Sequence, residues 1–169
     1  MSVLHAMRKY YFLIAAIIVL ADRGTKWLVA QRINLHDSIP VITGFFSLTH
    51  VENRGAAFGL FDDSPTQLKI TVLILFSVAA LVVVTTLLWK NSHAVSMTGM
   101  GLSLVMGGAI GNLWDRLFTG KVVDFLLFYV GSYHWPAFNV ADTAIVTGAI
   151  LLVAEILFVK TPKQETNAV

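Results

Sequence analysis

Two long stretches without a charged residue constrain this chain more than any other feature of its sequence. Residues 70–89 and 94–114 contain 20 and 21 uncharged, mostly apolar residues. About 20 such residues form a helix that crosses the roughly 30 Å hydrocarbon core of a bilayer. The sequence therefore predicts a membrane-spanning helix at each stretch.

Two further segments near the ends of the chain have a similar character. Residues 10–21 are apolar, and the apolar pattern resumes after Asp22 and Lys26. Residues 138–159 are apolar apart from Asp142 near the start and Glu155 near the end. We expect one membrane-embedded domain over residues 1–169, with four transmembrane helices at about 10–30, 70–89, 94–114 and 138–159.

The first segment also fits another interpretation. Arg8 and Lys9 precede an apolar run that ends at Ala21, as in a cleavable signal peptide. The apolar pattern that resumes after Asp22 favours a span instead.

The composition agrees with a membrane domain. Hydrophobic residues make up 56% of the chain and charged residues 13%, whereas a soluble domain carries about 25% charged residues. The mean hydropathy is +0.73. The chain has no cysteine, which excludes disulfides, a thiolate nucleophile and cysteine metal ligands. A net charge of +2 without a basic tract gives no support for nucleic-acid binding.

The charges between the spans predict their orientation. Positive residues favour the cytoplasmic side of a membrane. One side of the predicted spans carries five of them, namely Arg8, Lys9, Lys90, Lys160 and Lys163. The connections on the other side carry charges of both signs. We therefore expect both termini in the cytoplasm, and the connections 31–67 and 115–137 outside.

The longer outer connection predicts a small extracytoplasmic region at about 39–61. Residues 39–51 are rich in β-branched and aromatic residues, with breaks at Pro40 and Gly44, which is typical of one or two short strands. The apolar stretch 56–61 is too short to span and predicts a short interfacial helix or a membrane-dipping turn. The expected fold class is thus membrane α-helical, with a small β region and a short interfacial helix.

Two aspartates, Asp124 and Asp142, lie beside strongly apolar segments. A carboxylate near hydrocarbon is costly, so such a residue is a functional candidate. Two carboxylates held close together share a proton, because both cannot ionise easily. The ionised member then takes a proton from water while the protonated member polarises a carbonyl, as in an aspartic protease. The sequence separation by itself does not show that the two residues meet.

Asp142 also fits a structural interpretation. In Asn139-Val140-Ala141-Asp142, an Asn at the N-cap and an acid three residues later are typical of a helix start. The two roles are compatible. An Asp142 stabilised by the helix dipole would be the more acidic member of the pair, which leaves Asp124 as the residue that holds the proton.

Other polar residues flank these candidates. Asn112 shares one helical face with Asp115 and Arg116, which suits either an ion pair at the helix end or a polar clamp beside an active site. Asp22 and Lys26 are four residues apart, and an ion pair would let both enter the membrane edge.

Small and amide residues complete the set. Asn53 lies in a polar loop, where it could bind an extended substrate backbone or form a turn. Gly107, Gly108 and Gly111 suit close packing of helices. The histidines lack the helical spacing of zinc ligands, and Ser103 has no evident His partner, so zinc and serine proteases are disfavoured.

Five motifs together resemble the bacterial lipoprotein signal peptidase family, also called signal peptidase II. They are DRGTK at 22–26, ENRGAAF at 52–58, GGAIGNLWDR at 107–116, VVDF at 122–125 and PAFNVAD at 136–142. Each motif is only moderately specific. Their order and spacing in a chain with four predicted spans are highly specific together.

The resemblance implies an aspartic endopeptidase of the bacterial cytoplasmic (inner) membrane. Such an enzyme removes signal peptides from prolipoproteins, cutting before a cysteine that carries a diacylglyceryl group, and is inhibited by the cyclic peptide globomycin. The resemblance gives catalytic roles to Asp124 and Asp142. It gives substrate-binding or supporting roles to Asn53, Asn112, Arg116, Asn139, Asp22, Lys26, Gly55, Ala56 and Asp115.

Prolipoproteins and membrane lipid are the expected partners, without nucleic acid. No metal ligands converge in the sequence, so we expect no cofactor, and four spans can suffice for a monomer. The stretch 56–61 is a candidate cover over the scissile bond. Two other classes remain open from the residues alone: a small proton- or cation-coupled transporter, and a non-catalytic membrane assembly subunit.

Overall fold

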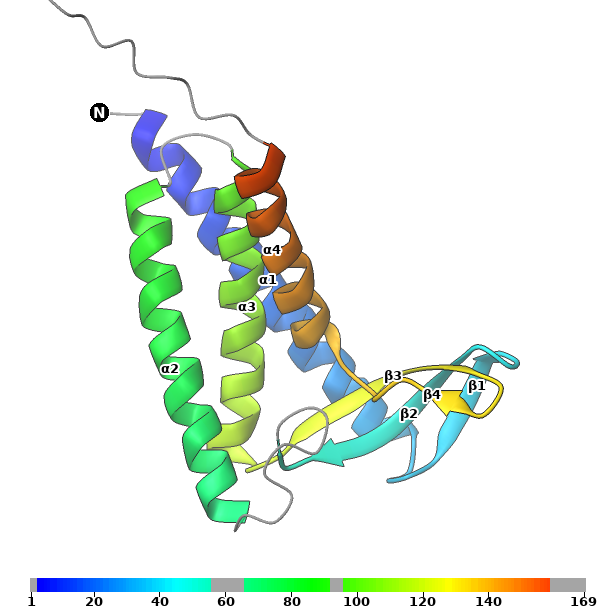
Figure 1. The fold of residues 1–169 in the computed structure, drawn as a ribbon. Helices are drawn as coiled ribbons and strands as arrows, with labels where there is room; N and C mark the ends of the chain where they lie inside the picture. Colours follow the sequence, from blue (N-terminus) through cyan, green and yellow to red (C-terminus); the bar gives the residue numbers. More distant parts are fainter. Residues whose placement is uncertain (1–2, 56–65, 92–95, 159–169) are drawn as a thin grey trace, which may run out of the picture.

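A computed structural model describes residues 3–55, 66–91 and 96–158, and shows a helical bundle with a small sheet at one end (Figure 1). The elements in chain order are α1 (Val3–Arg32), β1 (Ser38–Ile42), β2 (Phe46–Asn53), α2 (Thr66–Asn91), α3 (Met97–Phe118), β3 (Val122–Val130), β4 (Tyr133–His134) and α4 (Val140–Phe158). Two helices in the described part, α2 and α4, are long and apolar enough to cross a membrane.

The helices agree with the predicted segments, with shifted ends. The helix expected at 94–114 begins at Met97, where the Ser96 side chain accepts a hydrogen bond from the Gly99 N–H at 3.0 Å, and it continues to Phe118. The first helix is longer than the predicted span and includes residues on both sides of it. The candidate cover at 56–61 lies outside the described residues.

α3 is the central helix of the bundle. It packs against α1, α2 and α4, and the hydrophobic core lies where α1, α2 and α3 meet. Tyr11, Leu88, Leu102 and Met106 are buried there.

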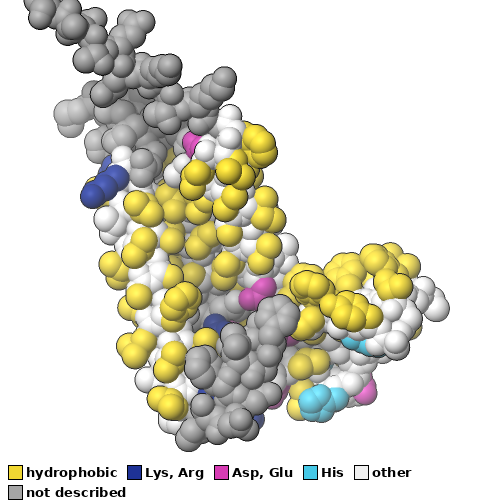
Figure 2. All heavy atoms as spheres, in the orientation of Figure 1, with side chains coloured by type: hydrophobic (Ala, Val, Ile, Leu, Met, Phe, Trp, Pro, Cys, Tyr) yellow, Lys and Arg dark blue, Asp and Glu magenta, His cyan; other side chains and the backbone are white. Residues whose placement is uncertain are grey.

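The outward surfaces of the helices are apolar instead of polar (Figure 2). Large hydrophobic side chains such as Phe76 on α2 and Ile156 on α4 are 73% and 80% exposed, as expected of helices that face lipid.

Glycines allow α3 and α4 to approach each other closely. A Cβ atom on Gly101 would lie 2.8 Å from the Gly148 carbonyl oxygen, and a Cβ on Gly148 would lie 2.6 Å from the Gly101 carbonyl oxygen. Nearer the sheet, a Cβ on Gly108 would meet the Ala141 carbonyl oxygen. These contacts confirm the expected packing role of Gly108 and bring the start of α4 against α3.

The sheet is antiparallel with strand order β1-β2-β3-β4 and projects from one end of the bundle (Figure 1). β1 and β2 confirm the strands expected within 39–51, whereas β3 was not predicted. The β2–β3 register is irregular between Leu48 and Val51, and this irregularity places Val51 opposite Asp124. An isolated antiparallel bridge joins Leu126 to Phe138, and this contact holds the segment before α4 against β3.

The close packing of α3 and α4 generates a stability prediction. Gly148→Ala should lower the free energy of unfolding by about 1–3 kcal/mol, because the new methyl group meets backbone that cannot move aside. Gly24→Ala is the matched control, since nothing lies within 4 Å of a Cβ at Gly24. Thermal unfolding in detergent micelles measures both. Equal melting temperatures for the two variants would contradict the packing argument.

Candidate active site

Asp124 lies on β3 and is almost fully buried, with 4% of its surface exposed. Its carboxylate accepts hydrogen bonds from two side-chain amides. Asn139 Nδ2 donates to Oδ1 at 2.7 Å, and Asn53 Nδ2 donates to Oδ2 at 3.1 Å. The Gly55 N–H donates to Asn53 Oδ1 at 2.9 Å and so orients this amide. The predicted site residues Asn53, Gly55 and Asn139 thus all hold Asp124, while Ala56 lies outside the described residues.

The pKa of Asp124 is raised to about 6. Burial is the main cause, because an ionised carboxylate loses its hydration. The charge of Asp142 raises the pKa further, while the amide hydrogen bonds from Asn53 and Asn139 lower it. The two aspartates are therefore close enough to influence each other, which the sequence separation could not show.

Asp142 lies at the start of α4, where the sequence predicts a helix cap. It is the third residue of α4, and its N–H donates to Asn139 Oδ1 at 2.9 Å. Its own Oδ2 accepts from the Asn139 N–H at 3.3 Å, which completes a reciprocal capping box. Its other oxygen, Oδ1, accepts from Asn112 Nδ2 at 2.7 Å. The predicted helix cap is confirmed, and the capping carboxylate is also part of the polar network.

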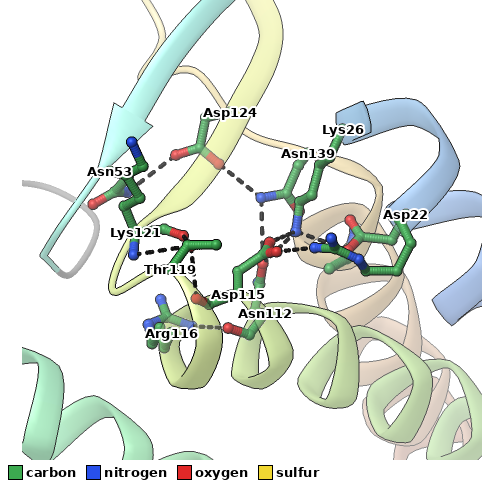
Figure 3. A network of polar contacts seen from close by, with 12 residues as sticks. Asp22, Lys26, Asn53, Asn112, Asp115, Arg116, Thr119, Lys121, Asp124 and Asn139 are labelled. Atoms are coloured by element: carbon green, nitrogen blue, oxygen red, sulfur yellow. Dashed lines mark hydrogen bonds and ion pairs between the residues drawn. The ribbon is translucent and has the colours of Figure 1, made fainter. Parts of the chain in front are cut away.

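Asn112 and Asn139 link the two aspartates. Asn139 Nδ2 points between Asp124 and the α3 side chains, and also lies 3.4 Å from Asn112 Oδ1 (Figure 3). Since Asn112 donates to Asp142 and Asn139 donates to Asp124, each carboxylate has its own amide donor. The two amides fix the side-chain positions of both acids without adding a charge.

Lys26 lies at the centre of the network and is only 2% exposed. Its Nζ lies 2.7 Å from Asp22 Oδ2, 2.7 Å from Asp115 Oδ2 and 3.0 Å from Asn112 Oδ1. Lys26 thus donates hydrogen bonds to Asp22 and Asn112 and forms an ion pair with Asp115. Asp22 Oδ1 in turn accepts the Ala141 N–H at 3.0 Å, which connects α1 to the first turn of α4.

The expected ion pair between Asp22 and Lys26 is confirmed, but it is part of a larger set. Asp115 pairs with Lys26 and also with Arg23, a residue that the sequence analysis did not assign to the site. Only its place in the DRGTK motif could have indicated Arg23. Gly111 differs from Gly107 and Gly108 in what it packs against, because a Cβ at Gly111 would lie 2.6 Å from Asp22 Oδ2. Gly111 therefore makes room for a carboxylate.

Arg116 completes the α3 part of the site. Its Nη1 donates to the Asn112 backbone oxygen at 3.3 Å, and the charges of Asp142 and Asp124 act on its guanidinium group. The charge of Asp115 acts on the same group, although the ion pairs of Asp115 are with Lys26 and Arg23. The position is compatible with a polar clamp beside the aspartates.

Charge balance supports a shared proton. Four carboxylates, Asp22, Asp115, Asp124 and Asp142, lie with three cations, Arg23, Lys26 and Arg116. The cluster is neutral when one carboxyl group keeps its proton. Among the described residues, both Asp124 and Asp142 accept hydrogen bonds from amides and from no cation. Burial raises the pKa of Asp124, which makes it suited to keep the proton. The described residues contain no group of three His, Cys, Asp or Glu that could hold a metal ion.

A family model described as signal peptidase (SPase) II matches residues 14–158. The chain belongs to the signal peptidase II family. The lipoprotein signal peptidase of Desulforapulum autotrophicum is 48% identical over 154 residues, covering 89% of this chain and 93% of that protein. The lipoprotein signal peptidase of Solibacter usitatus is 45% identical over 144 residues, covering 85% of this chain and 88% of that protein.

Solved structures show the same fold as this signal peptidase II member. One bacterial membrane enzyme, determined by the in meso method at 2.3 Å resolution, has a TM-score of 0.81 and 30% sequence identity, and 95% of each chain is covered. A second, at 1.9 Å resolution, has a TM-score of 0.78 and 32% identity, covering 90% of this chain and 95% of the other. These findings decide for a membrane peptidase over a transporter or an assembly subunit.

The raised pKa of Asp124 generates a pH prediction. The folded chain holds this proton more tightly than the unfolded chain, in which the pKa is near 3.8. The contribution of Asp124 to the free energy of unfolding is therefore fully present below about pH 4, and about 3 kcal/mol of it should be lost as the pH rises through about 6. Asp124→Asn should lack this decrease, whereas Asp37→Asn, at an exposed acid, should keep it. Thermal unfolding across pH in detergent tests this, and parallel curves for all three proteins would contradict it.

The buried ammonium group generates a second prediction for this site. Lys26→Met should lower the free energy of unfolding by about 3–5 kcal/mol, because Asp22 loses its cation in a buried position. Lys121→Met is the matched control, since its ion pair with Glu52 is partly exposed and contributes about 1 kcal/mol or less. Denaturant unfolding in micelles compares them. A smaller loss for Lys26→Met than for Lys121→Met would show that the buried cluster does not depend on this charge.

Proposed function

We propose that Asp124 and Asp142 together activate water in this enzyme and so cleave the peptide bond before a diacylglyceryl-modified cysteine. Members of the signal peptidase II family remove signal peptides from prolipoproteins, and this chain is such a protease. The observation that carries the proposal is the buried Asp124 with a pKa of about 6, held beside an acid with its own hydrogen-bond donors.

The arrangement supports a general acid/base mechanism. Ionised Asp142 takes a proton from a water molecule, while protonated Asp124 donates a hydrogen bond to the carbonyl oxygen of the scissile peptide. The water oxygen bonds to the carbonyl carbon and forms a tetrahedral intermediate, which takes the proton of Asp124 on its oxygen. The proton held by Asp142 passes to the leaving nitrogen, the C–N bond breaks, and Asp124 recovers a proton from the collapsing intermediate. The pair thus returns to its starting protonation state without a covalent intermediate.

The fixed amides support this chemistry. Asn139 and Asn53 keep Asp124 in place through hydrogen bonds to both of its oxygens, and Asn112 does the same for one oxygen of Asp142. Because these donors are neutral, they position the carboxylates without suppressing the proton of Asp124 as a cation in direct contact would. Catalytic groups that are already held in place need little free energy for reorganisation during the reaction.

The proposed setting is the outer face of the bacterial cytoplasmic membrane, in a single domain with four membrane-spanning helices and both termini in the cytoplasm. The site residues of α1 (within 22–26) and of α3 (within 112–116) belong to the parts of these helices nearest the sheet, which leaves the middle of each helix for hydrocarbon. At the other end, the Arg8 guanidinium lies 3.8 Å from the centre of the Trp89 ring, a contact suited to the cytoplasmic interface.

This position matches the substrate. A signal peptide is itself a membrane helix, and its lipid-modified cysteine lies at the outer headgroup level. An acid pair formed by β3 and the outer end of α4 is at the depth where the scissile bond lies. The proposed working unit is a monomer surrounded by membrane lipid.

The proposal predicts the behaviour of each aspartate. Asp124→Asn and Asp142→Asn should each lower kcat by about 10²–10⁴-fold, because each removes one partner of the proton transfer. Asp37→Asn, an exposed acid near the sheet, should keep full activity. The assay is cleavage of a diacylglyceryl-modified prolipoprotein by the purified chain in detergent, with products identified by mass. Activity should be indifferent to a metal chelator. Full activity of either site variant would remove that residue from the mechanism.

A further inference from the structure

Beyond the polar site, the sheet carries a pocket of about 420 Å³ with aromatic walls. The side chains that line it include Phe45, Phe128, Tyr129, Tyr133, Trp135 and Phe138. The pocket has a volume typical of ligand sites, which are mostly apolar and lined by aromatic residues. Its lining contains no charged residue and little polar surface, so it is suited to an apolar ligand.

The pocket walls are fixed in place by the sheet. Phe128 stacks on Phe138 with ring centres 5.9 Å apart and meets the edge of Phe45 at 5.4 Å. The backbone supports the same residues, because the Tyr129 N–H donates to the Phe45 oxygen at 2.9 Å and the Trp135 N–H donates to the Phe128 oxygen at 2.9 Å. A ligand therefore meets a largely preformed surface, which lowers the entropy lost on binding.

Two segments of the chain connect the pocket with the proposed active site. On β3, Phe128 is four residues beyond Asp124, a distance of about 13 Å along a strand. On the return segment, Phe138 is directly followed by Asn139, whose amide holds Asp124. Phe138 also exchanges backbone hydrogen bonds with Leu126, at 2.8 and 3.1 Å. A group attached next to the scissile bond can thus reach the pocket.

The orientation of the sheet decides what kind of group can reach it. Hydrophobic side chains gather on the upper side of the sheet as drawn, toward the direction in which the helices extend, and histidine side chains lie on the lower side (Figure 2). Val130, Tyr133 and Trp135 are 67%, 64% and 49% exposed. The apolar side is thus turned toward hydrocarbon when the bundle spans a membrane.

We infer that this pocket binds one acyl chain of the diacylglyceryl group on the substrate cysteine. The inference rests on the proposed function, which places that cysteine at the Asp124/Asp142 pair. The acyl chains extend from the cysteine back toward hydrocarbon, on the side to which the pocket opens. The mature part of the lipoprotein leaves on the opposite side, into water, so it is the less suitable occupant.

The test compares two prolipoprotein substrates that differ only in acyl length, one with dipalmitoylglyceryl-cysteine and one with dihexanoylglyceryl-cysteine. The purified full chain, in one detergent, is assayed for kcat/KM on both. Tyr133→Ala combined with Trp135→Ala should reduce the preference for the long-chain substrate by about tenfold, as expected when about two methylene groups lose their contacts. Cleavage of the short-chain substrate should be nearly unchanged.

Two further variants sharpen the comparison. Val130→Trp fills the pocket from its exposed rim and should also lower the preference for long chains, without removing a wall. Phe76→Ala removes an aromatic side chain that is 73% exposed on α2, far from the pocket lining, and should keep the preference of the unaltered protein.

The outcomes separate this inference from the proposed function. An unchanged chain-length preference in both pocket variants, with cleavage retained, would overturn the acyl-chain site and leave the acid pair standing. Equal losses on the two substrates would also overturn it, because they would show that the pocket holds the peptide or supports the sheet. If the unaltered chain cleaves neither substrate, the proposed function itself fails.

Discussion

A single buried ammonium group holds together the parts of this structure that meet at the site. Lys26 neutralises negative charge on both α1 and α3, because it pairs with Asp22 and Asp115. It also donates a hydrogen bond to Asn112. Two buried carboxylates without this cation would carry a desolvation cost that few contacts could offset. Because Asp22 also accepts an N–H from the first turn of α4, the same charge fixes three helices relative to one another.

The amides on either side of this centre explain how two acids can be held close together in different surroundings. Asp142 lies at the N-terminus of α4, where the helix dipole and the capping hydrogen bonds favour an anion. Asp124 lies on a strand, away from a helix terminus, and among the described residues it receives hydrogen bonds from the Asn53 and Asn139 amides. This difference in surroundings follows from the backbone around each residue, and it is the basis on which we propose Asp142 as the base and Asp124 as the proton holder.

Local patterns in the sequence were sufficient for much of this description. The helices, the cap formed by Asn139 and Asp142, and the ion pair between Asp22 and Lys26 depend on residues within four positions of one another. The strand β3 could not be found in the same way. Its apolar run resembles an aromatic interfacial loop, and only its pairing with β2, including the irregularity before Val51, makes it a strand. The pairing of Arg23 with Asp115 joins residues 92 positions apart, which no local spacing encodes.

The capping box at the start of α4 has a consequence for inhibitors of this enzyme. Asn139 and Asp142 bond each other's backbone N–H groups, and the same side chains bind Asp124 and Asn112. A substitution at either residue that weakens an inhibitor also removes a helix cap and a hydrogen bond to the side chain of Asp124 or Asn112. Resistance at these two positions would therefore disrupt the structure that holds the proposed catalytic acids.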